Sequence, residues 1–298
     1  MENRKANLFI VGAMKAGTTN LSSLLSQHPE IYFSPIKEPH YFVRSLSTRF
    51  YEPSRFFNLE TYLNKNLPEP LHIAKVETEK QYHKLFSLSL PSHKYLAEAS
   101  TCYLHDPESA KLIHEYNAQA KIIIILRNPL DRTFSDYSMN LGLSREKDSF
   151  NSVMERELNL YQEGKLPWHS YLGMSFYEEP VSRYKEIFSD VLVLNFEELI
   201  GNKDETLHKV NKFLGISDYN DYDIQDWNST RTLKNQKLFY YLKKIGLKDY
   251  FSQLFGAKFK RTLFNLISRK GKDPMKLSEG THKRILQLFK KHSQDAIA

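Results

Sequence analysis

The stretch "LFIVGAMKAGTTNLSSLL", residues 8–25, constrains the fold more than any other part of the sequence. It begins as an apolar run typical of a buried strand, passes through a loop bounded by Gly12 and Gly17, and continues with apolar residues at helical spacing. The first turn of a helix offers free N–H groups and the positive end of its dipole, so a strand, a glycine-bounded loop and a helix together outline a phosphate-binding loop. The stretch therefore predicts an α/β fold with an anion at this loop.

The loop differs from the version that binds nucleoside triphosphates. In the pattern G-x-x-x-x-G-K-[ST], a lysine directly follows the second glycine. Here Thr18 occupies that position, and Lys15 lies inside the loop. Thr18 and Thr19 add hydroxyl donors at the start of the helix. We therefore expect Lys15, Ala16, Gly17, Thr18 and Thr19 to bind the anion.

Four more apolar runs predict further buried strands. The four runs are "IYFS" (31–34), "KYLAEAS" (94–100), "KIIIIL" (121–126) and "VLVLNF" (191–196), and residues 8–12 are the fifth predicted strand. Helical patterns lie between them at 19–28, 79–88, 107–117, 129–143 and 181–188. Strands that alternate with helices favour a parallel sheet covered on both faces, with its ligands beyond the carboxyl ends of the strands. The prediction is one α/β domain with a P-loop-like central parallel sheet of about five strands, flanked by helices on both faces.

The last part of the chain differs from the α/β core predicted for residues 7–216. Residues 217–298 show helical patterns at 238–255 and 281–289, a basic loop at 268–276 and no convincing strand. Between residues 231 and 284 there are 15 Lys or Arg against three acidic residues, within a chain of net charge +7. This asymmetry indicates an anionic partner, or else a solvated helical face. A peripheral membrane contact of the segment 238–255 stays open, whereas nucleic acid is disfavoured because no known recognition motif is present.

Composition indicates a soluble protein of a reducing compartment. No stretch approaches the ~20 apolar residues of a membrane helix. The single cysteine, Cys102, cannot form a disulfide within the chain. We therefore expect a cytoplasmic protein. The eleven histidines are scattered without the spacing of a zinc site.

The segment "RNPLDRTFSDY" predicts a second anion site. Arg127 ends a buried strand, Pro129 suits the first turn of a helix, and Ser135 lies about two turns further on. An arginine fork and a hydroxyl that converge in this way form a phosphate clamp. Arg132 either joins the clamp or forms an ion pair on the helix surface.

Arg127 also stands where a nucleoside triphosphatase has the carboxylate that holds Mg²⁺. We therefore expect no metal ion. Glu197 and Glu198, near the end of the last strand, keep a Mg²⁺-dependent P-loop kinase or NTPase as the alternative function. A nucleic-acid-binding protein that uses the basic last third is the non-enzymatic alternative.

With these motifs in this order, the sequence resembles the sulfotransferases that use 3′-phosphoadenosine 5′-phosphosulfate (PAPS), particularly the branch of heparan-sulfate and bacterial enzymes. The resemblance implies that "GAMKAGTT" binds the 5′-phosphosulfate and that Arg127 and Ser135 bind the 3′-phosphate. Further matches are "PIKEPHYF" (35–42), "LAEASTCYL" (96–104), "SFYEEPVSRY" (175–184) and "VLVLNFEELIGNKDETLHKVNKFLGI" (191–216).

The resemblance also implies the chemistry. Glu38 is the base that takes the proton of the acceptor hydroxyl, while Lys37 and Lys15 stabilise the phosphosulfate and the departing oxygen. His40 is a second candidate, which binds the acceptor or shares the role of base. The predicted reaction moves a sulfuryl group from PAPS to a hydroxyl of a carbohydrate, or else of a lipid or polyketide-type alcohol, and leaves adenosine 3′,5′-bisphosphate.

The same resemblance assigns roles to less conspicuous segments. "NSTRTLKNQKL" (228–238) corresponds to a loop that closes over the nucleotide, so Arg231 and Lys234 are expected at the 3′-phosphate. In "EASTC", Ala99 replaces a lysine that the resemblance associates with polyanionic sugars, which argues against a heparan-type acceptor. Glu98, Ser100 and Tyr177 line the acceptor cleft or belong to the core. We expect the segments 43–80 and 140–175 to build the acceptor pocket.

Overall fold

A five-stranded sheet forms the centre of the protein in the computed structural model, which describes residues 4–53, 57–143, 145–219, 222, 231–233, 268–270 and 275–297. The strands lie in the order β2-β5-β1-β6-β7, and all neighbouring pairs are parallel. Their bounds are β1 Leu8–Gly12, β2 Ile31–Phe33, β5 Tyr95–Ala99, β6 Lys121–Leu126 and β7 Val191–Asn195. Both β1 and β5 are buried along their whole length, as unbroken apolar runs require. The prediction of a central parallel sheet of about five strands is confirmed.

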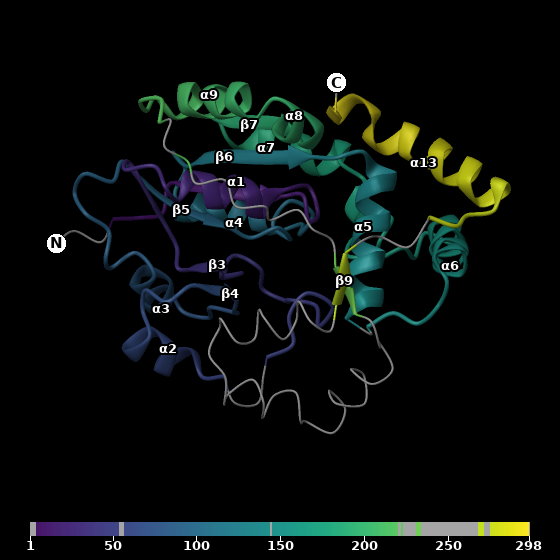
Figure 1. Ribbon diagram of the computed structural model, residues 1–298, viewed down its shortest axis with the longest axis horizontal. Coiled ribbons are helices and arrows are strands. Elements are labelled where there is room, and N and C mark those ends of the chain that lie inside the picture. Colours follow the sequence, from purple (N-terminus) through teal and green to yellow (C-terminus); the bar gives the residue numbers. More distant parts are fainter. Residues whose placement is uncertain are drawn as a thin grey trace.

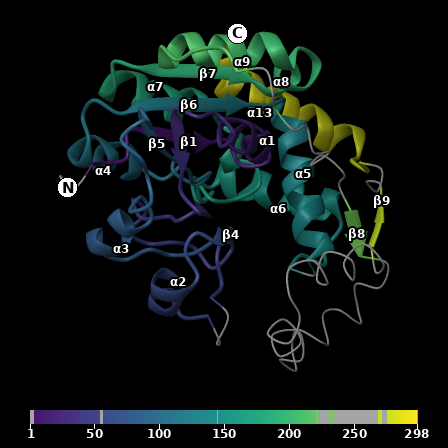
Figure 2. The same cartoon turned by 60° about the vertical axis from the view of Figure 1, so that its left-hand side comes forward.

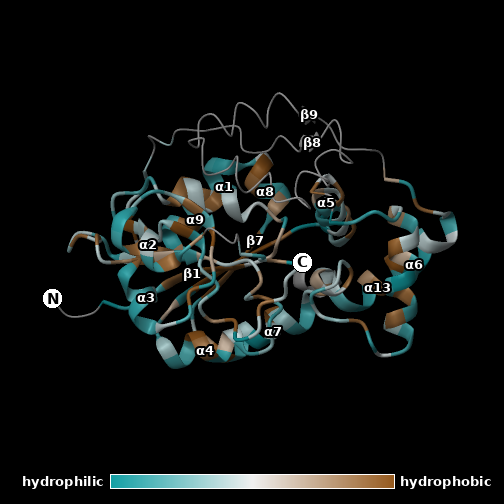
Figure 3. Cartoon of the chain, turned by 90° about the horizontal axis from the view of Figure 1, so that it is seen from below, coloured by the Kyte–Doolittle hydropathy of each residue, from teal (hydrophilic) through white to brown (hydrophobic). Residues whose placement is uncertain are grey.

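Helices cover both faces of this sheet, as predicted. Helices α1 (Thr18–Leu25), α8 (Phe196–Gly201) and α9 (Lys203–Leu214) lie on one face, and α4 (Ser109–Tyr116) and α7 (Glu178–Ile187) lie on the other (Figures 1 and 3). Because the strands are parallel, their carboxyl ends meet at one edge, where β1 delivers the glycine loop and β6 delivers Arg127.

A smaller parallel ribbon was not predicted from the sequence. It consists of β3 (Ile36–Glu38) and β4 (Leu71–Ile73), with Glu38 opposite Ile73 in the register. In the sequence, helix α2 (Leu59–Lys65) lies between these two strands and α3 (Glu79–Lys84) follows them, and both helices lie in the same region of the protein (Figure 2). Three-residue strands carry too little periodicity to be recognised. The ribbon matters because β3 also contacts β5 and so places Glu38 beside the end of β5.

Beyond the carboxyl edge lies a helical layer with its own apolar core. It contains α5 (Pro129–Gly142), α6 (Phe150–Gln162), the 3₁₀ turn η1 (Gly173–Ser175) and α13 (Glu279–Ile297), which crosses α5, α6 and α7 (Figure 1). The layer buries Phe134, Tyr137, Phe150, Val153, Met154, Leu158, Tyr171, Leu172, Ile285, Leu288 and Phe289. The helix predicted at 281–289 is thus confirmed. No helix in the described ranges is long and apolar enough to cross a membrane.

Two short strands occur where none was predicted. Strand β8 (Arg231–Leu233) pairs antiparallel with β9 (Ser268–Lys270), and β8 contacts α5 (Figure 2). The prediction that no strand follows residue 216 is therefore wrong, and the basic loop predicted at 268–276 begins as a strand. The helix predicted at 238–255, with its membrane contact, lies outside the described residues.

Candidate active site

The glycine loop has the shape that the sequence predicts. Gly17 is the N-cap residue of α1, with a φ of +86° and no side chain to cap the helix. Lys15 also has a positive φ, of 69°. A Cβ at Gly17 would lie 2.8 Å from Cδ2 of Phe196, so glycine is required for both space and backbone conformation. The Ala16 N–H donates to Ala13 O at 3.1 Å. The groups left to receive an anion are therefore those at the start of α1.

Lys15 is surrounded by other charged groups rather than by one ion-pair partner. Its ammonium donates to Met139 Sδ at 3.6 Å, and none of the ion pairs among the described residues includes it. Burial lowers the pKa of Lys15, the carboxylate of Asp136 raises it, and the nearby cations Arg127 and Lys37 lower it further. A buried ammonium among cations is a site that favours an anion.

Arg127 lies beside the loop, as predicted for the second anion site. Its Nη1 donates to Lys15 O at 3.2 Å, and its guanidinium lies 4.6 Å from the ring centroid of Phe196. Its Nε is buried and has no hydrogen-bond partner among the described residues. Ser135 is buried on α5, and Thr18 is buried at the start of α1. The structure thus brings the two predicted anion-binding segments together.

The prediction for Arg132 is only partly correct. It forms the expected ion pair with Asp136, at 3.2 Å between Nη1 and Oδ2, but both side chains are fully buried rather than on the helix surface. Its Nη2 donates to Tyr171 O at 2.6 Å. Arg49 reaches the same carboxylate oxygen at 2.5 Å. Arg132 is thus engaged within the helical layer, where it is not available to a phosphate.

Glu38 and Lys37 form a close ion pair at the end of β3. Lys37 Nζ lies 2.7 Å from Glu38 Oε1, and the Thr101 hydroxyl donates to Glu38 Oε2 at 3.0 Å. Burial raises the pKa of Glu38, but Lys37, His40 and His72 outweigh burial and hold it at about 2. The carboxylate is therefore ionised at neutral pH, as a proton acceptor must be.

His40 is buried beneath this pair, with 1% of its surface exposed. Its Nε2 lies 3.6 Å from Glu38 Oε2, and its Nδ1 lies 3.0 Å from Cys102 Sγ. Burial lowers the pKa of His40 to about 4, so the ring is neutral at physiological pH. Buried in this way, His40 is poorly placed to bind an acceptor directly.

The end of β5 supplies contacts that sequence reasoning did not assign. The Ser100 hydroxyl accepts the His40 N–H at 3.2 Å and donates to Glu98 Oε2 at 2.9 Å. Glu98 also accepts the hydroxyl of Tyr82 at 2.7 Å. Glu98, Ser100 and Tyr177 are fully buried, so of the two roles left open for them the structure favours the core.

His72 was also missed. It lies on β4 in the register position beside Lys37, its side chain is exposed, and its pKa is lowered by partial desolvation and by Lys37. The one signal in the sequence was its place within the segment 43–80, which we expected to contact the acceptor.

The structure says little about the predicted contact of Arg231 and Lys234 with the 3′-phosphate. Arg231 begins β8, which contacts α5, the helix that carries Ser135. Lys234 lies outside the described residues. The closing role of this segment stays a prediction. Within the described ranges, no group of three or more His, Cys, Asp or Glu side chains is arranged to hold a metal ion.

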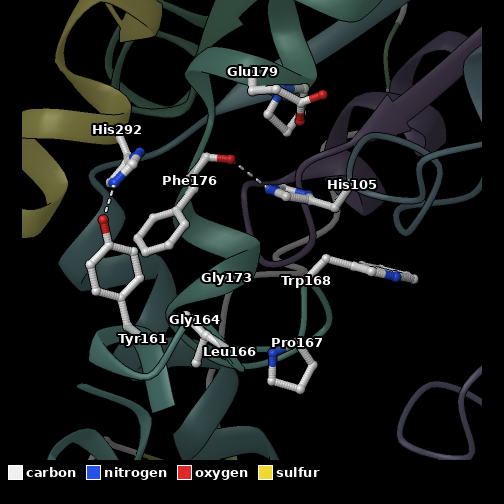
Figure 4. A pocket seen from close by; sticks show the side chains of 11 residues that line it. His105, Tyr161, Gly164, Leu166, Pro167, Trp168, Gly173, Phe176, Glu179 and His292 are labelled. Carbon is white, nitrogen blue, oxygen red and sulfur yellow. Dashed lines mark hydrogen bonds between the residues drawn. The ribbon is translucent and has the colours of Figure 1, made fainter. Parts of the chain in front are cut away.

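A separate pocket of about 370 Å³ lies between the end of α6, η1, α7 and α13 (Figure 4). It is lined by His105, Tyr161, Gly164, Leu166, Pro167, Trp168, Gly173, Phe176, Glu179, Pro180 and His292. In the close-up, His105 Nε2 donates to Phe176 O at 3.1 Å and Tyr161 contacts His292 Nε2 at 2.7 Å. None of the predicted catalytic or cofactor-binding residues lines it, although six lining residues belong to the segment 140–175: Tyr161, Gly164, Leu166, Pro167, Trp168 and Gly173. That residues 140–175 build the acceptor pocket stays a prediction.

Comparison with known proteins agrees with this arrangement. The model of the sulfotransferase family matches residues 7–221, which include the glycine loop, Glu38 and Arg127. The chain belongs to the sulfotransferase family. A solved sulfotransferase from Alicyclobacillus acidocaldarius is 32% identical, covers 75% of this chain and 87% of its own, and superposes with a TM-score of 0.58. The predicted family and enzyme class are confirmed, and a kinase is not favoured.

Curated relatives of this sulfotransferase are more distant. Carbohydrate sulfotransferase 15 of Mus musculus is 24% identical over 70% of this chain and 44% of the relative. The bifunctional heparan sulfate N-deacetylase/N-sulfotransferase 3 of Mus musculus is 25% identical over 74% of this chain and 23% of the relative. The sulfotransferase thus spans less than half the length of these relatives.

Proposed function

We propose that this sulfotransferase moves a sulfuryl group from PAPS to a hydroxyl of a carbohydrate. The observation that carries the proposal is the convergence of Lys15 and Arg127, both without ion-pair partners in the described structure, next to the Glu38–Lys37 pair. Two anion-binding cations beside an ionised carboxylate are what a reaction between an anionic donor and a hydroxyl requires.

The residues present fit the donor. The buried Nε of Arg127 has no hydrogen-bond partner in the part of the chain that the structure describes, and a second phosphate would supply one. Among the described residues, the Lys15 ammonium hydrogen-bonds a thioether and forms no ion pair, and a phosphosulfate would supply a charged partner. When bound, PAPS supplies the activated sulfuryl group and a phosphate leaving group. Lys15, Gly17, Thr18 and Thr19 would hold its 5′ end, while Arg127 and Ser135 would hold its 3′-phosphate.

Glu38 is the proposed base. Its carboxylate is ionised and only 12% exposed, so it is largely shielded from bulk water. A pKa of about 2 makes Glu38 a weak base in this arrangement, and Lys37 is the largest cause that lowers it. With PAPS bound, Lys37 could turn its ammonium toward the leaving-group oxygen, and Glu38 would then lose this partner and its pKa would rise. Lys37 thus couples proton acceptance to stabilisation of the leaving group.

The acceptor class rests on the relatives, two of which are named for carbohydrate and heparan sulfate substrates. Ala99 is fully buried at the end of β5, where the family pattern has a lysine suited to polyanionic sugars. We therefore propose an uncharged or weakly charged carbohydrate hydroxyl as the acceptor, with a lipid or polyketide-type alcohol as the second choice. The cytoplasmic location expected from the single cysteine is also a proposal.

Thermal unfolding tests the proposal. Adenosine 3′,5′-bisphosphate should raise the melting temperature, and EDTA should leave the increase unchanged, because the described cations take the place of a metal. ATP with Mg²⁺ and a single-stranded oligonucleotide serve as comparisons for the kinase and nucleic-acid alternatives. An increase with Mg-ATP and none with the bisphosphate would contradict the proposal.

A further inference from the structure

Three consecutive side chains at the end of β5 hold the loop that carries Glu38 and His40. Ser100 Oγ accepts the His40 N–H, Thr101 Oγ1 donates to Glu38 Oε2 at 3.0 Å, and Cys102 Sγ lies 3.0 Å from His40 Nδ1. His40 has a φ of +50°, a backbone conformation that residues other than glycine seldom adopt. The Ser100 contact holds the backbone N–H of His40, and the other two contacts hold the side chains of Glu38 and His40 beside the end of β5.

The position of the His40 proton follows from the groups that face its two nitrogens. A neutral imidazole carries one N–H and one lone pair. With the proton on Nδ1, the lone pair of Nε2 would face the ionised Glu38 Oε2 at 3.6 Å, which is repulsive. With the proton on Nε2, that N–H points toward the carboxylate and Nδ1 is free to accept a proton donor.

Cys102 is the group that faces Nδ1. Burial raises the pKa of the Cys102 thiol well above its usual value, so the sulfur keeps its proton. A protonated thiol donates to a lone pair, although weakly. The groups that act electrostatically on His40 are Glu38, Lys37, Lys75 and His72, and none of them takes the place of the thiol at Nδ1.

We propose that Cys102 is a positioning residue that donates its S–H to His40 Nδ1, holds His40 as the Nε2–H tautomer and so leaves Glu38 as the only proton acceptor. The inference rests on the proposed function for its catalytic meaning, but its geometry does not depend on the acceptor. In this arrangement the thiol engages Nδ1 of His40, while Nε2 lies 3.6 Å from Glu38 Oε2, buried and without a hydrogen-bond partner in the described part of the chain. On this proposal His40 does not share the role of base: its Nε2–H faces Glu38 Oε2 at 3.6 Å and acts on it electrostatically, whereas the Thr101 hydroxyl donates a hydrogen bond to that oxygen.

Infrared spectroscopy of the S–H stretching band tests the contact directly. Cys102 is the only cysteine of the chain, so the band reports this thiol alone. We expect the band of the wild-type protein to lie at lower frequency than the band of His40→Leu, because a hydrogen-bonded thiol is weakened. Equal frequencies in both proteins, or no S–H band in the wild type, would overturn the proposal.

Kinetics of two substitutions at Cys102 give a second test that does not depend on the folding of His40→Leu. Cys102→Ser keeps a donor and should retain kcat within about twofold. Cys102→Ala removes it and should lower kcat roughly five- to tenfold, the effect of one modest hydrogen bond, with the KM for PAPS unchanged. The pH profile of kcat should change in Cys102→Ala only, since loss of the donor to the Nδ1 lone pair makes the His40 ring easier to protonate.

These kinetic outcomes separate positioning from packing. Equal losses in both variants would indicate packing and would contradict the inference. If no acceptor is ever sulfated, the proposed function fails while the infrared test still decides the Cys102 contact.

Discussion

The guanidinium of Arg127 lies over the ring of Phe196, 4.6 Å from its centroid, and the same ring closes the space beside Gly17. The glycine loop and the arginine of the second anion site therefore share one wall. This relationship explains how two segments more than a hundred residues apart are held side by side.

Gly17→Ala should disturb both anion sites. The new Cβ would lie 2.8 Å from the Phe196 ring, and the alanine would have to adopt a φ of +86°. We therefore expect the free energy of unfolding to fall by about 1–3 kcal/mol. Gly164→Ala is the matched control, because Gly164 also has a positive φ, of +69°, but open space around it. Urea titration measures both. Equal losses would show that the contact with Phe196 has no effect.

Lys15 and Arg127 should each contribute to nucleotide binding. Lys15→Met and Arg127→Ala should each weaken binding of adenosine 3′,5′-bisphosphate about ten- to a hundredfold, as expected for charge-assisted hydrogen bonds. Arg127→Lys keeps the positive charge but loses the two-pronged guanidinium, so its affinity for the bisphosphate should lie between those of the wild type and Arg127→Ala. Lys111→Ala, whose side chain is 76% exposed, is the neutral control. Titration calorimetry that finds the same affinity for Arg127→Ala and the wild type would contradict the assignment.

Asp136 should be critical for stability. Its carboxylate is fully buried between Arg132 and Arg49, so Asp136→Asn leaves buried positive charge without a partner and should cost about 3–5 kcal/mol. Asp148→Asn breaks a pair that is half exposed and should cost less than about 1 kcal/mol. Urea unfolding compares the two variants, and similar losses would mean that burial of the first pair is overstated.

Glu98 should make stability depend on pH. Burial raises the pKa of Glu98 from 4.5 to about 7, against the lowering effect of the Tyr82 and Ser100 hydroxyls. Between these values the unfolded chain has released this proton while the folded protein keeps it. The free energy of unfolding should therefore fall as pH rises from 4.5 to 7, by up to about 3 kcal/mol.

Glu98→Gln should remove this part of the pH dependence, while Glu115→Gln, at a largely exposed position, should leave it in place. Urea titrations at several pH values measure it. An unchanged slope in Glu98→Gln would assign the dependence to other groups.

Much of the fold was predictable because strands β1, β5, β6 and β7 are five or six residues long and mostly apolar. The run "KIIIIL" has one structural interpretation, and β6 matches it residue for residue. Strands β3, β4, β8 and β9 are three residues each, and their pairing depends on the tertiary structure, so no local pattern reveals them.

The site was predictable where one segment carries the chemistry and unpredictable where distant segments meet. The glycine loop and Arg127 could be assigned from their own residues. The contacts of Thr101 with Glu38 and of Cys102 with His40 join residues about sixty positions apart. The burial of Arg132 depends on Tyr171 and Ser175, to which no local pattern points.

The central claim is that this sulfotransferase uses PAPS and that Glu38 takes the acceptor proton. The most direct test incubates wild-type protein and Glu38→Gln with sulfur-labelled PAPS and a panel of oligosaccharides in the presence of EDTA. The wild type should release one adenosine 3′,5′-bisphosphate for each labelled sugar. Glu38→Gln should bind the bisphosphate as well as the wild type but lose at least about a hundredfold in turnover. Full turnover by Glu38→Gln, or transfer only with added metal, would contradict the account.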